Sequence, residues 1–141
     1  MKIKSLLLVC LVLLLTASAA AQSGATAADL IAGVWKGDMG PNETTRFPIL
    51  MTLKVDGQGA ISGLITGPPQ PGEIKTGSFD AKTGALKLEV EVKGDGSVIR
   101  VNFDGTVING VAIGRVNGPG VVGDFKITKG GGDSAASQQP R

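Results

Sequence analysis

Apolar and polar residues alternate one by one along much of this chain. The clearest stretch is 86–93, Leu-Lys-Leu-Glu-Val-Glu-Val-Lys, in which apolar residues occupy one face and charged residues the other. The same period of two recurs in 47–55, 99–104 and 121–128. A period of two places successive side chains on opposite faces of a β-strand, so these stretches predict antiparallel strands with one dry and one wet face.

Glycine, proline, asparagine and aspartate divide the alternating stretches into about eight strands. We expect them at 31–39, 46–55, 60–66, 73–79, 85–93, 97–104, 106–108 continuing past a turn into 111–116, and 120–129. Asn109-Gly110 is the strongest hairpin signal, because a type I′ turn requires two residues that tolerate a positive φ. Short connections between successive strands indicate a meander.

A meander with one apolar face has to bury that face against itself, since no stretch shows the period of an amphipathic helix that could cover it. Closure into a barrel buries the face and removes exposed strand edges. The sequence therefore predicts an all-β fold, a single antiparallel up-and-down meander of about eight strands closed into a barrel. A two-sheet β-sandwich is the alternative.

The N-terminus has the pattern of a secretory signal peptide. Lys2 and Lys4 precede an apolar run from Leu6 to Leu15, and small residues follow, ending in Ala-x-Ala at 19–21. The run is about half of the ~20 residues that a membrane-spanning helix needs. We expect cleavage after Ala21, no transmembrane helix in the mature chain, and a secreted or periplasmic location.

The chain then divides into four segments. We expect a signal peptide at 1–21, a flexible N-terminal arm at 22–30, the barrel at 31–129 and a disordered tail at 130–141. Lys2 and Lys4 account for the formal net charge of +2. The mature chain is therefore neutral, which argues against a nucleic-acid partner. The single cysteine, Cys10, lies within the signal peptide, so no disulfide is expected.

The mature chain has few groups with which to catalyse a reaction. It contains no His, Tyr or Cys, so the commonest general base and the best nucleophile are missing. We expect no metal and no other cofactor. Asp38, Glu43 and Glu73 could converge at one end of the barrel and do acid–base chemistry, but solvated loop charge is the simpler explanation. We therefore expect a protein that is not an enzyme.

Two irregular loops interrupt the series of short turns. Residues 40–45 follow the first expected strand, and residues 67–72, with three prolines, follow the third. Loops after odd-numbered strands leave an up-and-down barrel at the same end, so both should flank one opening, unless they are plain connectors. The rim residues expected there are Met39, Asn42, Glu43, Pro68, Pro69 and Glu73.

A Gly-x-Trp motif at 33–35, in the first strand of an eight-stranded meander, resembles the calycin superfamily of lipocalins, fatty-acid-binding proteins and avidins. The resemblance implies that Trp35 closes the barrel floor and that a basic residue near the last strand packs across it. Lys129 is the first candidate and Arg115 the second. The late helix and the disulfide of lipocalins have no counterpart here, so the chain looks closer to short, glycine-rich secreted bacterial barrels of unknown role.

Two functions suit such a barrel. The first is binding of a small apolar or amphiphilic ligand inside it, although the side chains could instead fill the interior. The candidate ligand-binding residues are Trp35, Ile49, Met51, Leu53, Leu88, Val90, Val101, Phe103 and Phe125. The second is a protein-binding module, such as an inhibitor of an exported enzyme, which would act through the rim loops or the N-terminal arm.

Overall fold

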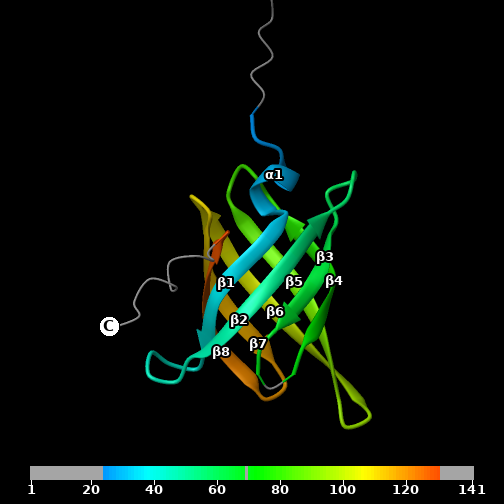
Figure 1. The fold of residues 1–141 in the computed structure, drawn as a ribbon, viewed down its shortest axis with the longest axis vertical. Helices are drawn as coiled ribbons and strands as arrows, with labels where there is room; N and C mark the ends of the chain where they lie inside the picture. Colours follow the sequence, from blue (N-terminus) through cyan, green and yellow to red (C-terminus); the bar gives the residue numbers. More distant parts are fainter. Residues whose placement is uncertain (1–23, 69, 131–141) are drawn as a thin grey trace, which may run out of the picture.

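The fold is a closed barrel of eight antiparallel strands (Figure 1). The structure is a computed structural model that describes residues 24–68 and 70–130. The strands follow one another around the barrel in the order in which they occur in the chain. This confirms the predicted up-and-down meander closed into a barrel and excludes the β-sandwich.

One short helix, α1 (Ala27–Ile31), precedes the strands. The strands are β1 (Gly33–Gly40), β2 (Phe47–Val55), β3 (Ile61–Thr66), β4 (Gly72–Phe79), β5 (Ala85–Gly94), β6 (Ser97–Ile108), β7 (Val111–Gly118) and β8 (Val121–Lys129). Strand β1 pairs with both β2 and β8, and Trp35 lies opposite Met51 on one side and Lys129 on the other. The pairing of β1 with β8 closes the barrel.

Helix α1 occupies residues that the sequence assigned to the flexible arm. The Thr26 hydroxyl oxygen accepts a hydrogen bond from the backbone N–H of Asp29 at 3.2 Å, and the Thr26 backbone N–H donates to the Asp29 carboxylate at 2.9 Å. This reciprocal pair is a capping box, which fixes the start of a helix. Residues 27–30 are therefore helical, and the expectation of an arm from 22 to 30 has to be shortened accordingly.

Strand β6 runs unbroken through Gly105, whereas the sequence predicts two separate strands, 97–104 and 106–108. Gly105 pairs with Leu86 on β5 and with Gly114 on β7, so it is an ordinary member of the ladder. A Cβ atom at this position would lie only 2.8 Å from Cζ of Phe125. The glycine makes room for that ring inside the barrel and does not form a turn.

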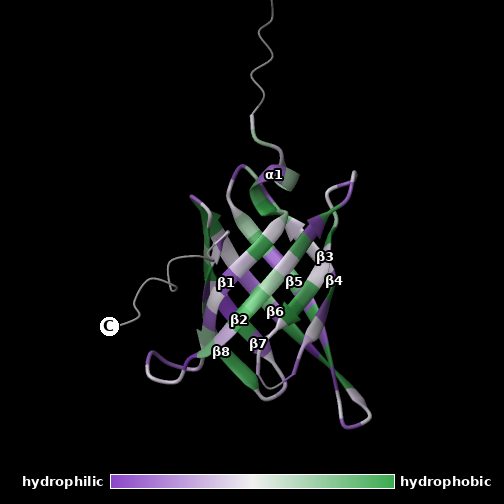
Figure 2. Cartoon of the chain, in the orientation of Figure 1, coloured by the Kyte–Doolittle hydropathy of each residue, from purple (hydrophilic) through white to green (hydrophobic). Residues whose placement is uncertain are grey.

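Hydrophobic and hydrophilic residues alternate along the strands (Figure 2). The apolar residues of this pattern form one buried core. All nine candidate ligand-binding residues are buried, and the buried residues of 24–68 and 70–130 include no polar or charged side chain. Phe103 and Phe125 meet edge to face, with ring centroids 5.3 Å apart. The pattern therefore identifies correctly which side chains face the interior.

Within the described part of the chain, no helix has the length and apolar character needed to cross a membrane. The expected signal peptide, 1–21, lies outside the described residues, as does the expected tail beyond Gly130.

Candidate functional site

The two ends of the barrel differ. Strands β1, β3, β5 and β7 all end on the same side, where the connections 41–46, 67–71, 95–96 and 119–120 lie. We call this end the mouth; it is at the bottom of Figure 1. The opposite end, which we call the floor, carries α1. Both irregular loops are therefore at the mouth.

Helix α1 closes the floor. Ile31 is fully buried, and its carbonyl oxygen accepts a hydrogen bond of 2.8 Å from the indole Nε1 of Trp35. The Lys129 ammonium group donates to the carbonyl oxygen of Asp29 in the same helix. The helix is thus attached to both β1 and β8, on the two sides of the seam that closes the barrel.

The two basic candidates for covering Trp35 lie in different places. Lys129 is directly opposite Trp35 in the pairing of β1 with β8 and reaches α1 with its ammonium group. Arg115 is exposed on β7, opposite Asp104 and Asp124. Lys129 is therefore the basic residue beside the tryptophan.

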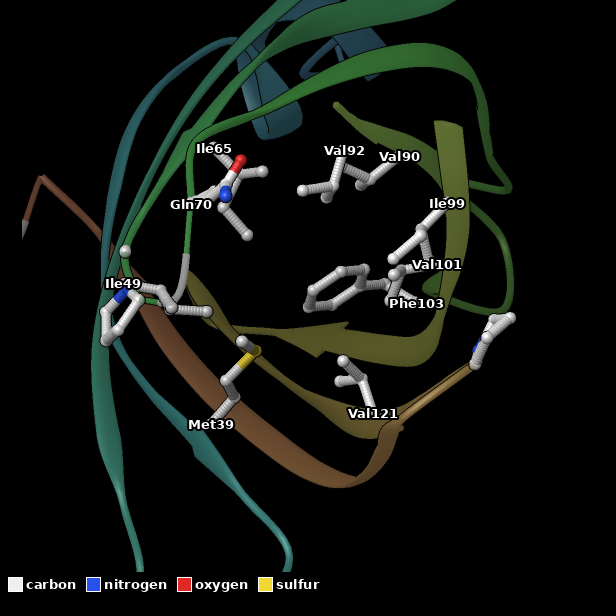
Figure 3. A pocket seen from close by; sticks show the side chains of 13 residues that line it. Met39, Ile49, Ile65, Gln70, Val90, Val92, Ile99, Val101, Phe103 and Val121 are labelled. Atoms are coloured by element: carbon white, nitrogen blue, oxygen red, sulfur yellow. The ribbon is translucent and has the colours of Figure 1, made fainter. Parts of the chain in front are cut away.

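A cavity of about 70 Å³ lies inside the barrel toward the mouth (Figure 3). We call it the mouth cavity, and Figure 3 shows that side chains from several strands point into it. Its lining residues are Met39, Ile49, Ile65, Gly67, Pro68, Gln70, Val90, Val92, Ile99, Val101, Phe103, Pro119 and Val121. Gln70 is the one polar side chain of this described lining.

A second hollow, of about 370 Å³, adjoins the mouth cavity and extends over the rim. We call it the rim groove. It is lined by Met39, Gly40, Pro41, Phe47, Pro68, Val116, Gly120, Val121 and Val122. Met39, Pro68 and Val121 line both spaces. Phe47 is 40% exposed and Val122 69% exposed, so the groove offers apolar surface to water.

The nine candidate ligand-binding residues divide between the two halves of the barrel. Four of them line the mouth cavity: Ile49, Val90, Val101 and Phe103. The other five are buried but do not line this cavity: Trp35, Met51, Leu53, Leu88 and Phe125. The interior is therefore packed with side chains toward the floor and open toward the mouth.

The expected rim residues also have different surroundings. Met39 and Pro68 line both hollows, whereas Pro69 lies outside the described residues. The Asn42 side-chain oxygen accepts a hydrogen bond of 2.8 Å from the backbone N–H of Thr45, so it shapes its own loop. Glu43 is exposed in the same loop.

Two of the three acidic candidates for acid–base chemistry are engaged in ion pairs. Asp38 accepts a hydrogen bond of 2.8 Å from Nε of Arg46, which also pairs with Asp124. Glu73 pairs with Lys75 at 2.8 Å, and this contact lowers the pKa of Glu73. In the described ranges, no three acidic residues gather into a group that could hold a metal ion. The rim carboxylates thus do not form one cluster.

Sequence reasoning missed several residues of the mouth cavity. Val92 continues the inward series of Val90 on β5, and Ile99 precedes Val101 on β6 in the same way. Both residues lie within the alternating stretches 86–93 and 99–104, so the signal that could have identified them was already present in the sequence. Gln70 lies in a loop, where no periodic signal exists.

Comparison with protein-family models, with curated proteins and with solved structures finds no match for this chain. The eight-stranded antiparallel barrel is consistent with calycin-like topology. The likeness to calycins thus concerns the fold alone, and the site has to be interpreted from its own geometry.

Proposed function

We propose that this protein is an exported, non-enzymatic barrel that binds a small apolar or amphiphilic molecule at its mouth. The observation that carries the proposal is the asymmetry of the interior. The floor is closed by α1 and filled by Trp35, whereas the mouth contains an apolar cavity that adjoins an apolar groove. Covering apolar surface that faces water is favourable, so a ligand that covers it lowers the free energy of the system.

The two volumes bear on the shape of the ligand. The mouth cavity, about 70 Å³, is larger than the ~10–15 Å³ that one water molecule needs and smaller than the ~300–1,000 Å³ of an ordinary small-molecule site. The rim groove, about 370 Å³, falls within that range. The ligand would therefore insert a narrow apolar end into the cavity and lay the rest of its body along the groove.

Export and the lack of an enzymatic role are supported by the sequence. The basic, apolar and small-residue regions of 1–21 favour export. The lack of His, Tyr and Cys after Ala21 favours binding over catalysis.

Two methionines provide a direct test, because they lie in different halves of the barrel. Met39 lines both hollows, and Met51 is fully buried in the packed half. In NMR spectra of protein labelled at the methionine methyl groups, a panel of straight-chain and aromatic amphiphiles should shift the Met39 resonance saturably. The Met51 resonance should move little.

A pair of variants makes this test specific. Val92→Phe places a ring in the mouth cavity and should weaken binding. Ile113→Phe is the matched control, because Ile113 is 54% exposed on β7 and lines neither hollow. A panel that leaves Met39 unmoved, or a folded Val92→Phe variant that binds normally, would show the proposal to be wrong.

The exposed apolar rim favours a second function, the docking of an exported protein. Phe47 and Val122 would be its contacts, whereas α1 lies at the opposite end of the barrel. Inhibition assays against exported proteases can separate the two surfaces. Replacing Phe47 and Val122 with serine would abolish an interaction at the rim. Deleting residues 22–25, which leaves the Thr26 cap in place, would abolish one through the segment before α1.

A further inference from the structure

We infer that the ligand at the mouth is an electrically neutral amphiphile whose polar group is held by the side-chain amide of Gln70. Alcohols, esters and amides with a narrow apolar end belong to this class, and ionised fatty acids do not. The inference rests on the proposed function and names the chemical class of its ligand.

The first observation is the lack of charge in the site. No ionisable side chain is among the described residues that line the mouth cavity or the rim groove. A carboxylate that enters such a site loses water and gains no counter-ion, which costs several-fold more free energy than the transfer of a hydroxyl or ester group. The site should therefore favour neutral polar groups over anions.

An ion-paired group of charges beside the rim groove does not alter this conclusion. Arg46 is held by Asp38 and Asp124, and these three residues together carry one net negative charge. The pairing with two carboxylates occupies the guanidinium group and raises the pKa of Arg46. An approaching anion would therefore meet repulsion at this part of the rim.

Arg100 and Lys93 each follow, in the chain, a residue that lines the mouth cavity. Arg100 pairs with Glu89 and Glu91, which leaves Lys93 to be considered. Lys93 follows Val92, which lines the mouth cavity, so the alternation of β5 turns Lys93 to the outer face. Lys93 lines a separate outer hollow together with Asp95 and Gln70. A ligand anion would have to leave the cavity to reach it, and the test below includes this residue.

The second observation is the position of Gln70. It lies in the loop between β3 and β4 and lines both the mouth cavity and the outer hollow, at the boundary between apolar interior and water. Figure 3 shows its amide group among the apolar side chains around the opening. A Cβ on Gly94 would lie 3.4 Å from both the nitrogen and the oxygen of this amide, so the amide lies beside the mouth end of β5.

An amide group suits a neutral ligand. It offers both a hydrogen-bond donor and an acceptor, so it can match a hydroxyl, an ester or another amide without any change of charge. A binding site that is apolar except for one such group fixes the orientation of its ligand through that group. Gln70 is therefore the residue that would select the polar end.

The test compares three straight-chain compounds of equal, medium chain length: the alcohol, the acid and the alkane. Their affinities are measured by calorimetry near pH 7, where the acid is ionised, and the Met39 methyl shift confirms the site. We expect the alcohol to bind at least about tenfold more tightly than the acid, because the carboxylate finds no partner. Gln70→Leu should weaken alcohol binding by about two- to tenfold and leave alkane binding unchanged.

Two control variants accompany this comparison. Gln58→Leu makes the same substitution in an exposed turn at the floor. It should change neither the affinity for the alcohol nor the affinity for the alkane. Lys93→Gln removes the cation of the outer hollow and should not change the order of the affinities.

The possible failures are distinguishable. If the acid binds as tightly as the alcohol, the inference is overturned and the proposed function stands. Loss of acid binding in Lys93→Gln would show that Lys93 holds the carboxylate. Equal alcohol binding by the wild type and Gln70→Leu overturns the role of Gln70. If none of the three compounds moves the Met39 resonance, the proposed function and the inference both fail.

Discussion

The indole nitrogen of Trp35 donates a hydrogen bond of 2.8 Å to the backbone carbonyl oxygen of Ile31. The carbonyl groups in the last turn of a helix have no partner within the helix, so this bond satisfies a group of α1 as well as the indole. Both residues are fully buried. The chain's single tryptophan thus joins the floor of the barrel to the helix that covers it.

Replacing Trp35 with phenylalanine should destabilise the fold by about 2–3 kcal/mol, because the change removes buried volume and leaves the Ile31 carbonyl group unpaired. Urea unfolding followed by circular dichroism measures the effect. Val34→Thr on the same strand is the control, since Val34 is 42% exposed and faces outward. Equal stability of the two variants would mean that the hydrogen bond and the packing at the floor contribute nothing.

Acid should loosen α1 before the barrel unfolds. The hydrogen bonds from Thr26 lower the pKa of Asp29 below its ordinary value of 3.8. A carboxylate whose pKa is lower in the folded state stabilises that state above its unfolded pKa, and this contribution is lost as the pH falls through the folded value. The fluorescence of Trp35 should therefore shift to the red below about pH 4, before the strands unfold.

Two variants assign this acid response to Asp29. Asp29→Asn removes the titrating group and should abolish the early fluorescence change. Glu73→Gln removes the other carboxylate with a lowered pKa, which lies in β4 beside Lys75, and should leave the change intact. An acid response that persists in Asp29→Asn would have another origin.

Alanine at Gly105 should destabilise the barrel by about 1–3 kcal/mol, the usual effect of overpacking a core. Its Cβ would lie 2.8 Å from the Phe125 ring and 2.6 Å from the Ile113 carbonyl oxygen, and the backbone atom has no freedom to move away. Gly57→Ala is the matched control, because nothing lies within 4 Å of its Cβ. Thermal unfolding of both variants distinguishes a local clash from a general intolerance of alanine.

Arg46→Gln should lower the urea midpoint, and the difference from the wild type should shrink as salt is added. The variant leaves Asp38 on β1 and Asp124 on β8 without their shared cation, and salt screens the repulsion that results. Lys54→Gln, on the exposed face of β2, removes the same charge elsewhere. If the decrease in urea midpoint caused by Arg46→Gln does not depend on salt, the hydrogen bonds of Arg46 stabilise the fold and its charge does not.

The alternation of apolar residues was sufficient to predict the barrel, because each inward position on a strand has to be apolar when one face is dry. It failed where the local signal was short or ambiguous. Helix α1 is a single turn, too short to show a helical period, although the Thr26 and Asp29 spacing of a capping box was present in the sequence. The break expected between 104 and 106 is absent because Gly105 lies within β6, and the sequence does not show that the Phe125 ring packs over it.

The candidate site was predictable only in part, for a related reason. Alternation shows which side chains point inward but not which of them touch one another, and the open space depends on how the side chains of different strands fill the interior. Ile49 and Met51 are equivalent in the pattern, yet the first lines the mouth cavity and the second lies in the packed half. The irregular loops at 40–45 and 67–72 did indicate which end is open, whereas the helix that closes the other end was not predicted.

The pairing of β1 with β8 also determines when the protein can fold. The first strand finds its second neighbour only in the last strand to be synthesised, and contacts between such distant parts of a chain form slowly. The ammonium group of Lys129 likewise reaches α1 only when synthesis of the barrel is complete. A shortened chain that lacks β8 would expose two unpaired edges and would tend to aggregate. The chain can therefore close its barrel only after the last strand is complete.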